Sequence, residues 1–111
     1  MTDATLPDEI TAATLKGMHD AGRAFVLLDV RERDEWDTAH IIWAKHVPMG
    51  EIPDRLTELP KNANVVVMCH GGVRSDRVAR YLRQQGFASV ANLAGGIDAW
   101  SHEIDASVPT Y

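Results

Sequence analysis

Residues 65–75, which read VVVMCHGGVRS, carry the strongest structural signal in the chain. The run from Val65 to Met68 is apolar throughout, as is typical of a strand that is covered on both faces of a sheet. The glycines after it favour a tight loop. The segment from Ser75 to Gln85 then spaces its apolar residues as a helix does, and it ends before Gly86. These residues therefore predict a buried strand, a glycine-bearing loop and a helix.

Similar segments on either side of this unit predict how the rest of the chain is organised. A continuous apolar run predicts a strand at residues 25–28, and residues 90–93 are a weaker candidate. Shorter pieces around Ile10 and at residues 45–47 predict edge strands. Residues 11–21 predict a further helix. Strands that alternate with helices in this way predict an α/β fold, with a central, mostly parallel five-stranded sheet flanked by helices on both faces.

The length and charge of the chain restrict its organisation and its partners. A chain of 111 residues allows one domain, which we expect to span 9–104 between an N-terminal extension at 1–8 and a C-terminal tail at 105–111. The net charge of −5 argues against nucleic acid as a partner. No apolar run approaches the ~20 residues of a membrane span, and the first residues lack the pattern of a signal peptide. The chain is therefore expected to be a soluble cytoplasmic protein without a membrane partner.

Cys69 is the only cysteine of the chain, and its position makes its thiol a candidate nucleophile. A single cysteine excludes an internal disulfide and a tetrathiolate zinc site, and a free thiol is typical of a reducing compartment. Taken alone, a cysteine after a valine-rich strand is more often an inert core residue. Here a glycine loop, an arginine and a helix start all follow it, and that combination favours a reactive thiol.

The loop that follows Cys69 has the composition of an anion-binding loop. A tight turn into a helix N-terminus directs several backbone N–H groups inward, and Gly71 and Gly72 permit the backbone angles that this requires. Arg74 adds a positive charge close by. A thiol in such a field ionises readily, with a pKa of about 3.5–7.5 in place of about 8.5. The thiolate is itself the nucleophile, so no separate general base is required.

Two more charged residues are expected near this loop. Asp29 and Arg31 follow a buried strand, and the functional groups of parallel sheets lie just beyond the carboxyl ends of the strands. They either contact substrate or form a charged network that ties the next loop to its neighbours, and the second interpretation is favoured. His40, His46 and His70 lack the spacing of a zinc site, so neither a metal nor another cofactor is predicted. His40 is interpreted as structural, and the role of His70 is left open.

Three blocks of sequence carry a resemblance to a known family. The first block consists of LDVRE at 28–32, EW at 35–36, HI at 40–41, Ala44 and VP at 47–48, and it resembles the amino-terminal motif of rhodanese-type sulfurtransferases. The second block, CHGGVRS at 69–75, resembles the active-site loop of that family. The third block consists of GF at 86–87 and LAGGIDAW at 93–100, and it resembles the family's carboxyl-terminal motif. The ending IDASVPTY at 104–111 is also similar to that of rhodanese domains fused to enzymes that activate sulfur carriers.

This resemblance implies a single rhodanese-like domain with thiosulfate sulfurtransferase activity. Cys69 would receive the outer sulfur of thiosulfate or a similar donor as a persulfide and pass it to a small-molecule or protein thiol acceptor. The resemblance assigns substrate binding to the loop residues, which are His70, Gly71, Gly72, Val73, Arg74 and Ser75. Asp29 and Arg31, from their position at the end of a buried strand, are expected to support these residues from behind.

Two other functions are weighed against this one. The first is a sulfur-relay or binding module whose Cys69 is loaded by a partner protein, and the likeness at residues 104–111 favours it. The second is a phosphatase or arsenate reductase. Related domains of that class have five residues between cysteine and arginine, whereas four separate Cys69 from Arg74. The shorter loop suits one sulfur atom better than a tetrahedral oxyanion.

One feature departs from the family's pattern, and one group of arginines has no role that the resemblance assigns. The family usually has Pro-Gly where this chain has Ile42 and Trp43, so the turn lacks its glycine and the role of Trp43 is open. Further along, Arg77, Arg80 and Arg83 recur at intervals of three. A solvated helix face is the favoured interpretation, and a docking surface for an acidic partner is the alternative.

Overall fold

The computed structural model describes residues 5–111, and within them five strands form one sheet in the order β1-β5-β4-β2-β3. The strands are β1 (Glu9–Ile10), β2 (Val26–Asp29), β3 (Lys45–His46), β4 (Asn64–Met68) and β5 (Ser89–Leu93). Every pair runs parallel, so the expected five-stranded sheet is confirmed and is parallel throughout. All five carboxyl ends therefore lie at the same edge of the sheet.

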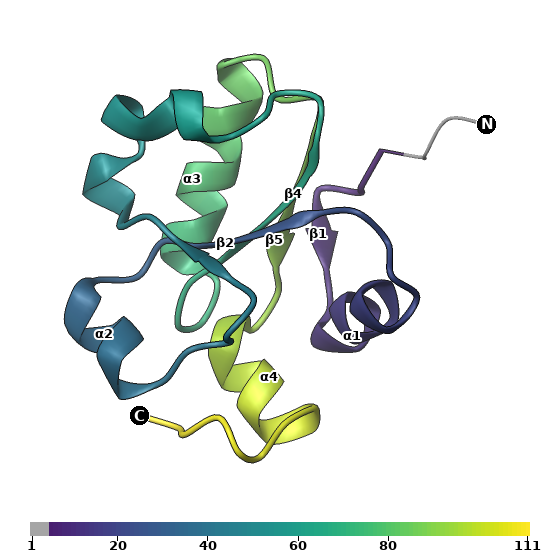
Figure 1. Ribbon diagram of the computed structural model, residues 1–111, viewed down its shortest axis with the longest axis vertical. Helices are drawn as coiled ribbons and strands as arrows, with labels where there is room; N and C mark the ends of the chain where they lie inside the picture. The colour runs from purple at the N-terminus through teal and green to yellow at the C-terminus, as the bar shows by residue number, and fades with distance from the viewer. Residues whose placement is uncertain (1–4) are drawn as a thin grey trace.

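Helices cover both faces of this sheet, as the sequence predicts (Figure 1). The α-helices are α1 (Ala12–Asp20), α2 (Arg33–Thr38), α3 (Val73–Gln84) and α4 (Gly96–Glu103), and the 3-10 helices are η1 (Met49–Glu51) and η2 (Pro53–Glu58). One core contains Leu15 of α1 and Trp100 of α4. The other contains Leu82 of α3 and residues around η1 and η2. Within residues 5–111, no helix has the length and apolar character needed to cross a membrane.

Strand β4 forms the centre of the molecule because its side chains enter both cores. Val66 and Met68 belong to the core under α1 and α4, whereas Val65 and Val67 belong to the core under α3. All four side chains are fully buried. This alternation explains why the run at 65–68 is apolar at every position, since neither face of the strand meets water.

The segments at both ends of the chain pack against the domain. Leu6 and Val108 are buried in the same core, and the backbone N–H of Leu6 donates to Ser89 Oγ at 2.8 Å. Residues 1–4 of the expected N-terminal extension lie outside the described residues. After α4 the chain turns back and ends beside α2, which brings Tyr111 close to Glu35 (Figure 1).

The turn at residues 41–44 forms without the glycine that the family usually has there. The N–H of Ala44 donates to the carbonyl of Ile41, and within residues 5–111 no residue other than glycine has a positive φ. Ile42 is 87% exposed at the tip. The Trp43 ring stacks on His19 at 4.0 Å and meets Trp100 edge-on at 5.7 Å. Trp43 thus packs at the edge of the first core, which answers the question that the sequence left open.

Helix α4 begins in close contact with the start of the cysteine loop. Its first residue, Gly96, has a φ of 58°. The next two N–H groups, of Ile97 and Asp98, donate to the carbonyl oxygens of Cys69 and His70 at 3.0 and 3.1 Å. A Cβ on Gly96 would collide with those same two carbonyl groups. The approach of these two backbones therefore requires glycine at this position.

Replacing Gly96 by alanine should separate α4 from the loop. We expect Gly96→Ala to lower the free energy of unfolding by about 2–4 kcal/mol, because it adds a backbone clash to an unfavourable φ. Gly17→Ala is the matched control, since Gly17 lies exposed inside α1 with open space around it. That change should raise the same free energy by about 0.5–1 kcal/mol. Urea denaturation of the two variants measures both effects, and equal stability of Gly96→Ala and the unchanged protein would contradict the prediction.

Candidate active site

The sulfur of Cys69 lies at the centre of the loop that joins β4 to α3. Cys69 directly follows β4 and only 1% of its surface is exposed. Its Sγ accepts a hydrogen bond from the backbone N–H of Gly72 at 3.1 Å and lies 3.3 Å from Ser75 Oγ. The thiol is therefore surrounded by hydrogen-bond donors rather than by apolar side chains alone.

The backbone of Gly72 produces this arrangement. Gly72 has a φ of 110°, a left-handed conformation that residues with a side chain rarely adopt. Its left-handed turn starts helix α3 at Val73, two residues earlier than the apolar spacing indicates. Ser75 consequently lies in the first helical turn, where its hydroxyl reaches the sulfur.

The donors around Sγ lower the pKa of the Cys69 thiol. Burial by itself raises that pKa, but the hydroxyl of Ser75 and the backbone N–H groups of Ser75, Gly72 and Arg74 outweigh it. Each of these donors comes from the loop or the first turn of α3. The direction agrees with the expectation from the sequence, and it means that a larger fraction of the thiol is ionised at neutral pH than for an ordinary cysteine.

Ser75 connects the sulfur to a polar network behind the loop. Its hydroxyl has a single hydrogen, which it donates either to Sγ or to Asn92 Oδ1 at 2.5 Å. Asn92 is held in place because its Nδ2 donates to the Gly72 carbonyl at 3.1 Å and to Glu9 Oε2 at 3.4 Å. A neutral thiol can donate to the hydroxyl, whereas a thiolate can only accept from it. The hydroxyl can therefore serve both states of the thiol by rotating its hydrogen alone.

Arg74 closes the loop and pairs with a carboxylate from another element. Its Nη1 and Nη2 donate to the two oxygens of Glu35 in α2 at 2.6 and 2.9 Å. The guanidinium is the main reason that the pKa of Glu35 falls to about 2; burial opposes it, and the Glu32 backbone and the Tyr111 hydroxyl assist it. Both partners therefore stay charged at neutral pH. The N–H groups of Arg74 that Glu35 does not occupy are the ones that a ligand can use.

Asp29 and Arg31 form a fully buried ion pair at the end of β2. Arg31 Nη2 lies 2.7 Å from Asp29 Oδ2, and both side chains have no exposed surface. The same guanidinium donates to the carbonyl groups of Glu35 and Ala39 and to the hydroxyl of Tyr111. These bonds hold the segment that follows β2, so the geometry favours the charged network over direct substrate contact.

The remaining loop residues form the outer part of the site. The His70 ring lies 4.4 Å from the ring of Tyr111, and its Nε2 is 3.9 Å from Asp98 Oδ1. Gly71 is exposed, and Val73 is an exposed hydrophobic residue. All the loop positions that the sequence singles out thus lie together, around the sulfur or on the outside of the loop.

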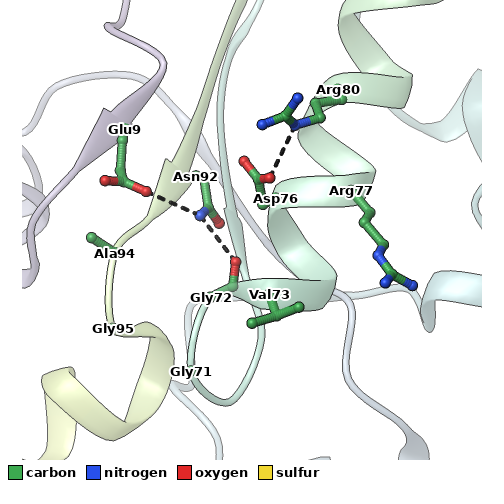
Figure 2. A pocket seen from close by; sticks show the side chains of 10 residues that line it. All are labelled: Glu9, Gly71, Gly72, Val73, Asp76, Arg77, Arg80, Asn92, Ala94 and Gly95. Atoms are coloured by element: carbon green, nitrogen blue, oxygen red, sulfur yellow. Dashed lines mark hydrogen bonds and ion pairs between the residues drawn. The ribbon is translucent and has the colours of Figure 1, made fainter.

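A cavity of about 500 Å³ adjoins the outer side of the loop (Figure 2). It is lined by Gly71, Gly72 and Val73 of the loop and by residues of β1, β5 and α3. Figure 2 shows Asn92 between Glu9 and Gly72, and the ion pair of Arg80 with Asp76 beside it. Cys69 does not line this cavity, so it offers space beside the loop and not a path to the sulfur.

Three polar residues at this site were not singled out by the sequence reasoning. Glu35 appears there only as part of a motif, Tyr111 only as part of a tail, and Asn92 only as part of a strand. The acidic residue at position 35 is a signal that could have been used, because a partly buried cation such as Arg74 is stabilised by a carboxylate partner. Nothing local in the sequence indicates that Tyr111 folds back to α2.

Comparison with known proteins identifies relatives over nearly the whole chain. Residues 11–103 match the rhodanese-like domain family. The putative sulfurtransferase YtwF of Bacillus subtilis is 41% identical over 95 residues, which cover 86% of this chain and 91% of the relative. The putative sulfur carrier protein YrkF of the same organism is 38% identical over 93 residues, or 84% of this chain. The match spans only 50% of that longer protein.

A solved structure shows the same architecture. The rhodanese-like domain protein from Staphylococcus aureus superposes with a TM-score of 0.82 and 33% identity, over 95% of this chain and 99% of that one. The match covers both the parallel sheet and the elements that carry the cysteine loop. The relatives of the chain include proteins named as a putative sulfurtransferase and a putative sulfur carrier. On this evidence the chain belongs to the rhodanese-like domain family.

Proposed function

We propose that the protein is a sulfurtransferase that carries sulfur as a persulfide on Cys69, with thiosulfate or a similar sulfane compound as the donor. The observation that carries this proposal is a sulfur atom held by Gly72 N–H and Ser75 Oγ at the end of β4. A thiolate in that position can attack a sulfane sulfur, and the same donors can hold the charge that the product bears. The relatives named as sulfurtransferases support it.

The reaction takes place in two displacements on sulfur. The Cys69 thiolate attacks the outer sulfur of thiosulfate, the bond to the sulfonate sulfur breaks, and sulfite leaves with the electron pair. Cys69 then carries a terminal sulfur with a negative charge. A second nucleophile, such as cyanide or a thiolate, attacks that terminal sulfur, and the Cys69 thiolate is released. Electrons balance in each step, so no metal or organic cofactor takes part.

Arg74 has two tasks in this mechanism. Its positive charge favours the thiolate, and the N–H groups left free by Glu35 bind the sulfonate end of the donor. The backbone amides from His70 to Ser75 hold the terminal sulfur. Asp29 and Arg31 act indirectly, because they fix the segment from which Glu35 reaches Arg74.

A sulfur-relay module is the second candidate function. In this case a partner protein loads Cys69, and thiosulfate is a poor donor. The relative named as a putative sulfur carrier favours it. Steady-state assays with thiosulfate and cyanide separate the two functions, because a relay module accumulates persulfide from its partner but turns over thiosulfate slowly. Mass spectrometry of protein purified without reductant should show an addition of about 32 Da on Cys69 in either case.

Removing the nucleophile should abolish sulfur transfer without unfolding the protein. We expect Cys69→Ser to have no measurable activity with thiosulfate and cyanide, because a serine hydroxyl is not ionised at neutral pH. Its unfolding midpoint should stay close to that of the unchanged protein, because the replacement is small and keeps the loop backbone. Substantial residual activity in a folded Cys69→Ser protein contradicts the mechanism.

Removing the cation of Arg74 should make the thiol less acidic. Arg74→Ala deletes a positive charge and leaves the Glu35 carboxylate unpaired, and both changes disfavour the thiolate. We therefore expect the pH midpoint of Cys69 alkylation to rise and the KM for thiosulfate to increase. Arg77→Ala, which removes an exposed cation one turn further along α3, is the matched control. Superimposable alkylation curves for Arg74→Ala and the control would mean that the Ser75 hydroxyl and the backbone donors set the pKa without the charge of Arg74.

The length of the loop should determine the reaction class. A phosphoryl group has three equatorial oxygens that need donors, whereas four residues between Cys69 and Arg74 suit one sulfur atom. We expect thiosulfate turnover and no hydrolysis of aryl phosphates. A glycine inserted between Gly71 and Gly72 should reduce sulfur transfer about 10²–10³-fold, since it draws a donor away from the sulfur. If the unchanged protein hydrolyses an aryl phosphate faster than it transfers sulfur from thiosulfate, the proposed function is refuted.

A further inference from the structure

We propose that Tyr111 is a positioning residue for the cysteine loop, which it anchors from outside by linking two ion pairs and by packing against His70. The proposal deepens the proposed function, because it identifies what holds the loop in the conformation that sulfur transfer needs. Tyr111 comes from the segment after α4. Its contacts among the described residues are with Arg31, Glu35 and His70, so we propose that it acts on the sulfur through these residues.

The hydroxyl of Tyr111 joins the two ion pairs of the site. It accepts a hydrogen bond from Arg31 Nη1 at 2.9 Å and donates one to Glu35 Oε2 at 2.8 Å. On one side of it lies the fully buried pair of Arg31 with Asp29, and on the other the pair of Glu35 with Arg74. The result is a continuous chain of hydrogen bonds that starts at Asp29, at the end of β2, passes through the Tyr111 hydroxyl and ends at Arg74 in the loop.

The ionisation states of these groups keep the chain intact at neutral pH. Burial and the neighbouring Glu35 carboxylate raise the pKa of the Tyr111 hydroxyl, while the Arg31 guanidinium opposes them. The hydroxyl therefore keeps its proton and can donate to a carboxylate. Glu35, whose pKa is about 2, stays charged as the acceptor. Each hydrogen bond of the tyrosine thus has an ionised partner, which makes both bonds stronger than bonds between neutral groups.

The ring of Tyr111 reaches the other end of the loop. It lies 4.4 Å from the His70 ring, and the Arg31 guanidinium carbon lies 5.6 Å from its centroid. His70 is the residue directly after Cys69, and Arg74 is five residues after it. One side chain thus restrains both ends of the loop whose N–H groups surround the sulfur. The residue remains 44% exposed, so its ring forms part of the protein surface next to the site.

Loss of the hydroxyl should loosen the loop without removing any donor to the sulfur. In Tyr111→Phe the ring stays, but the Glu35 carboxylate loses its link through the hydroxyl to Arg31, which then holds Glu35 only by its backbone carbonyl. The donors at residues 72–75 then spend less time on Sγ, and we expect the pH midpoint of Cys69 alkylation to rise by about 0.5 unit. We also expect kcat/KM for thiosulfate to fall about tenfold, mainly through KM, because two bonds to charged groups are lost.

Two comparisons separate positioning from a general loss of stability. Tyr81→Phe removes a phenolic hydroxyl from α3, where Tyr81 packs beside the second core, and it should leave the alkylation midpoint unchanged. Glu35→Ala removes the group through which the hydroxyl acts. If Tyr111 acts through Glu35, adding Tyr111→Phe to Glu35→Ala produces almost no further shift, whereas independent effects add. His70 and Asp98, the titratable groups that flank the loop, are present in all these variants. A difference in the alkylation midpoint between variants therefore does not come from a change at these two residues.

Alkylation of the single thiol with iodoacetamide, followed against pH by intact mass, provides the decisive measurement. A raised midpoint in Tyr111→Phe that disappears in the Glu35→Ala background supports the proposal. A midpoint equal to that of the unchanged protein, or a shift that adds fully to that of Glu35→Ala, overturns it. The readout needs no sulfur donor. Absence of thiosulfate turnover in the unchanged protein would therefore count against the proposed function and leave this test intact.

Discussion

The contact between α4 and the first two residues of the cysteine loop is the constraint on which the site depends. The carbonyl groups of Cys69 and His70 accept hydrogen bonds from the N–H groups of Ile97 and Asp98, so they need no partner within the loop. The chain then turns through Gly72, whose N–H faces Sγ. A loop that had to satisfy those carbonyls by itself could not present its N–H groups to a single atom. The chemistry at Cys69 is therefore supported by a helix almost thirty residues later in the chain.

A second layer of support consists of charged groups that are fully or partly buried. Burying the Asp29–Arg31 pair, and in part the Glu35–Arg74 pair, costs desolvation energy, which is recovered only when each charge has a partner. Here the two pairs are also joined to each other, because Arg31 and Glu35 both bond Tyr111 from the segment after α4. The arrangement fixes the mutual position of elements that are distant in the sequence. This is a structural use of charge that apolar side chains could not reproduce with the same directionality.

The fold and the cysteine loop could be predicted from sequence because both leave local patterns. A strand buried on both faces must be apolar at every position, as residues 65–68 are, and a loop that binds through its backbone needs glycine. The partners of Arg74 could not be predicted in this way. Glu35 lies 39 residues before it and Tyr111 follows it by 37, and no periodicity connects such positions. The start of α3 was misplaced by two residues because apolar spacing does not register a glycine that caps a helix.

The same donors have to serve two different species under the proposed function. In the free enzyme the charge lies on Sγ, which Gly72 and Ser75 hold. In the persulfide it lies on a sulfur about 2 Å further out, the length of one S–S bond. Donors that bound Sγ too strongly would stabilise the thiolate at the expense of its nucleophilicity and would leave the terminal sulfur without partners. Under the proposed function, N–H groups on different loop residues avoid this, because one set holds Sγ and another holds the terminal sulfur. A loop built from amides, held rigid at both ends, therefore suits a reaction in which the charged atom changes place while the cysteine does not.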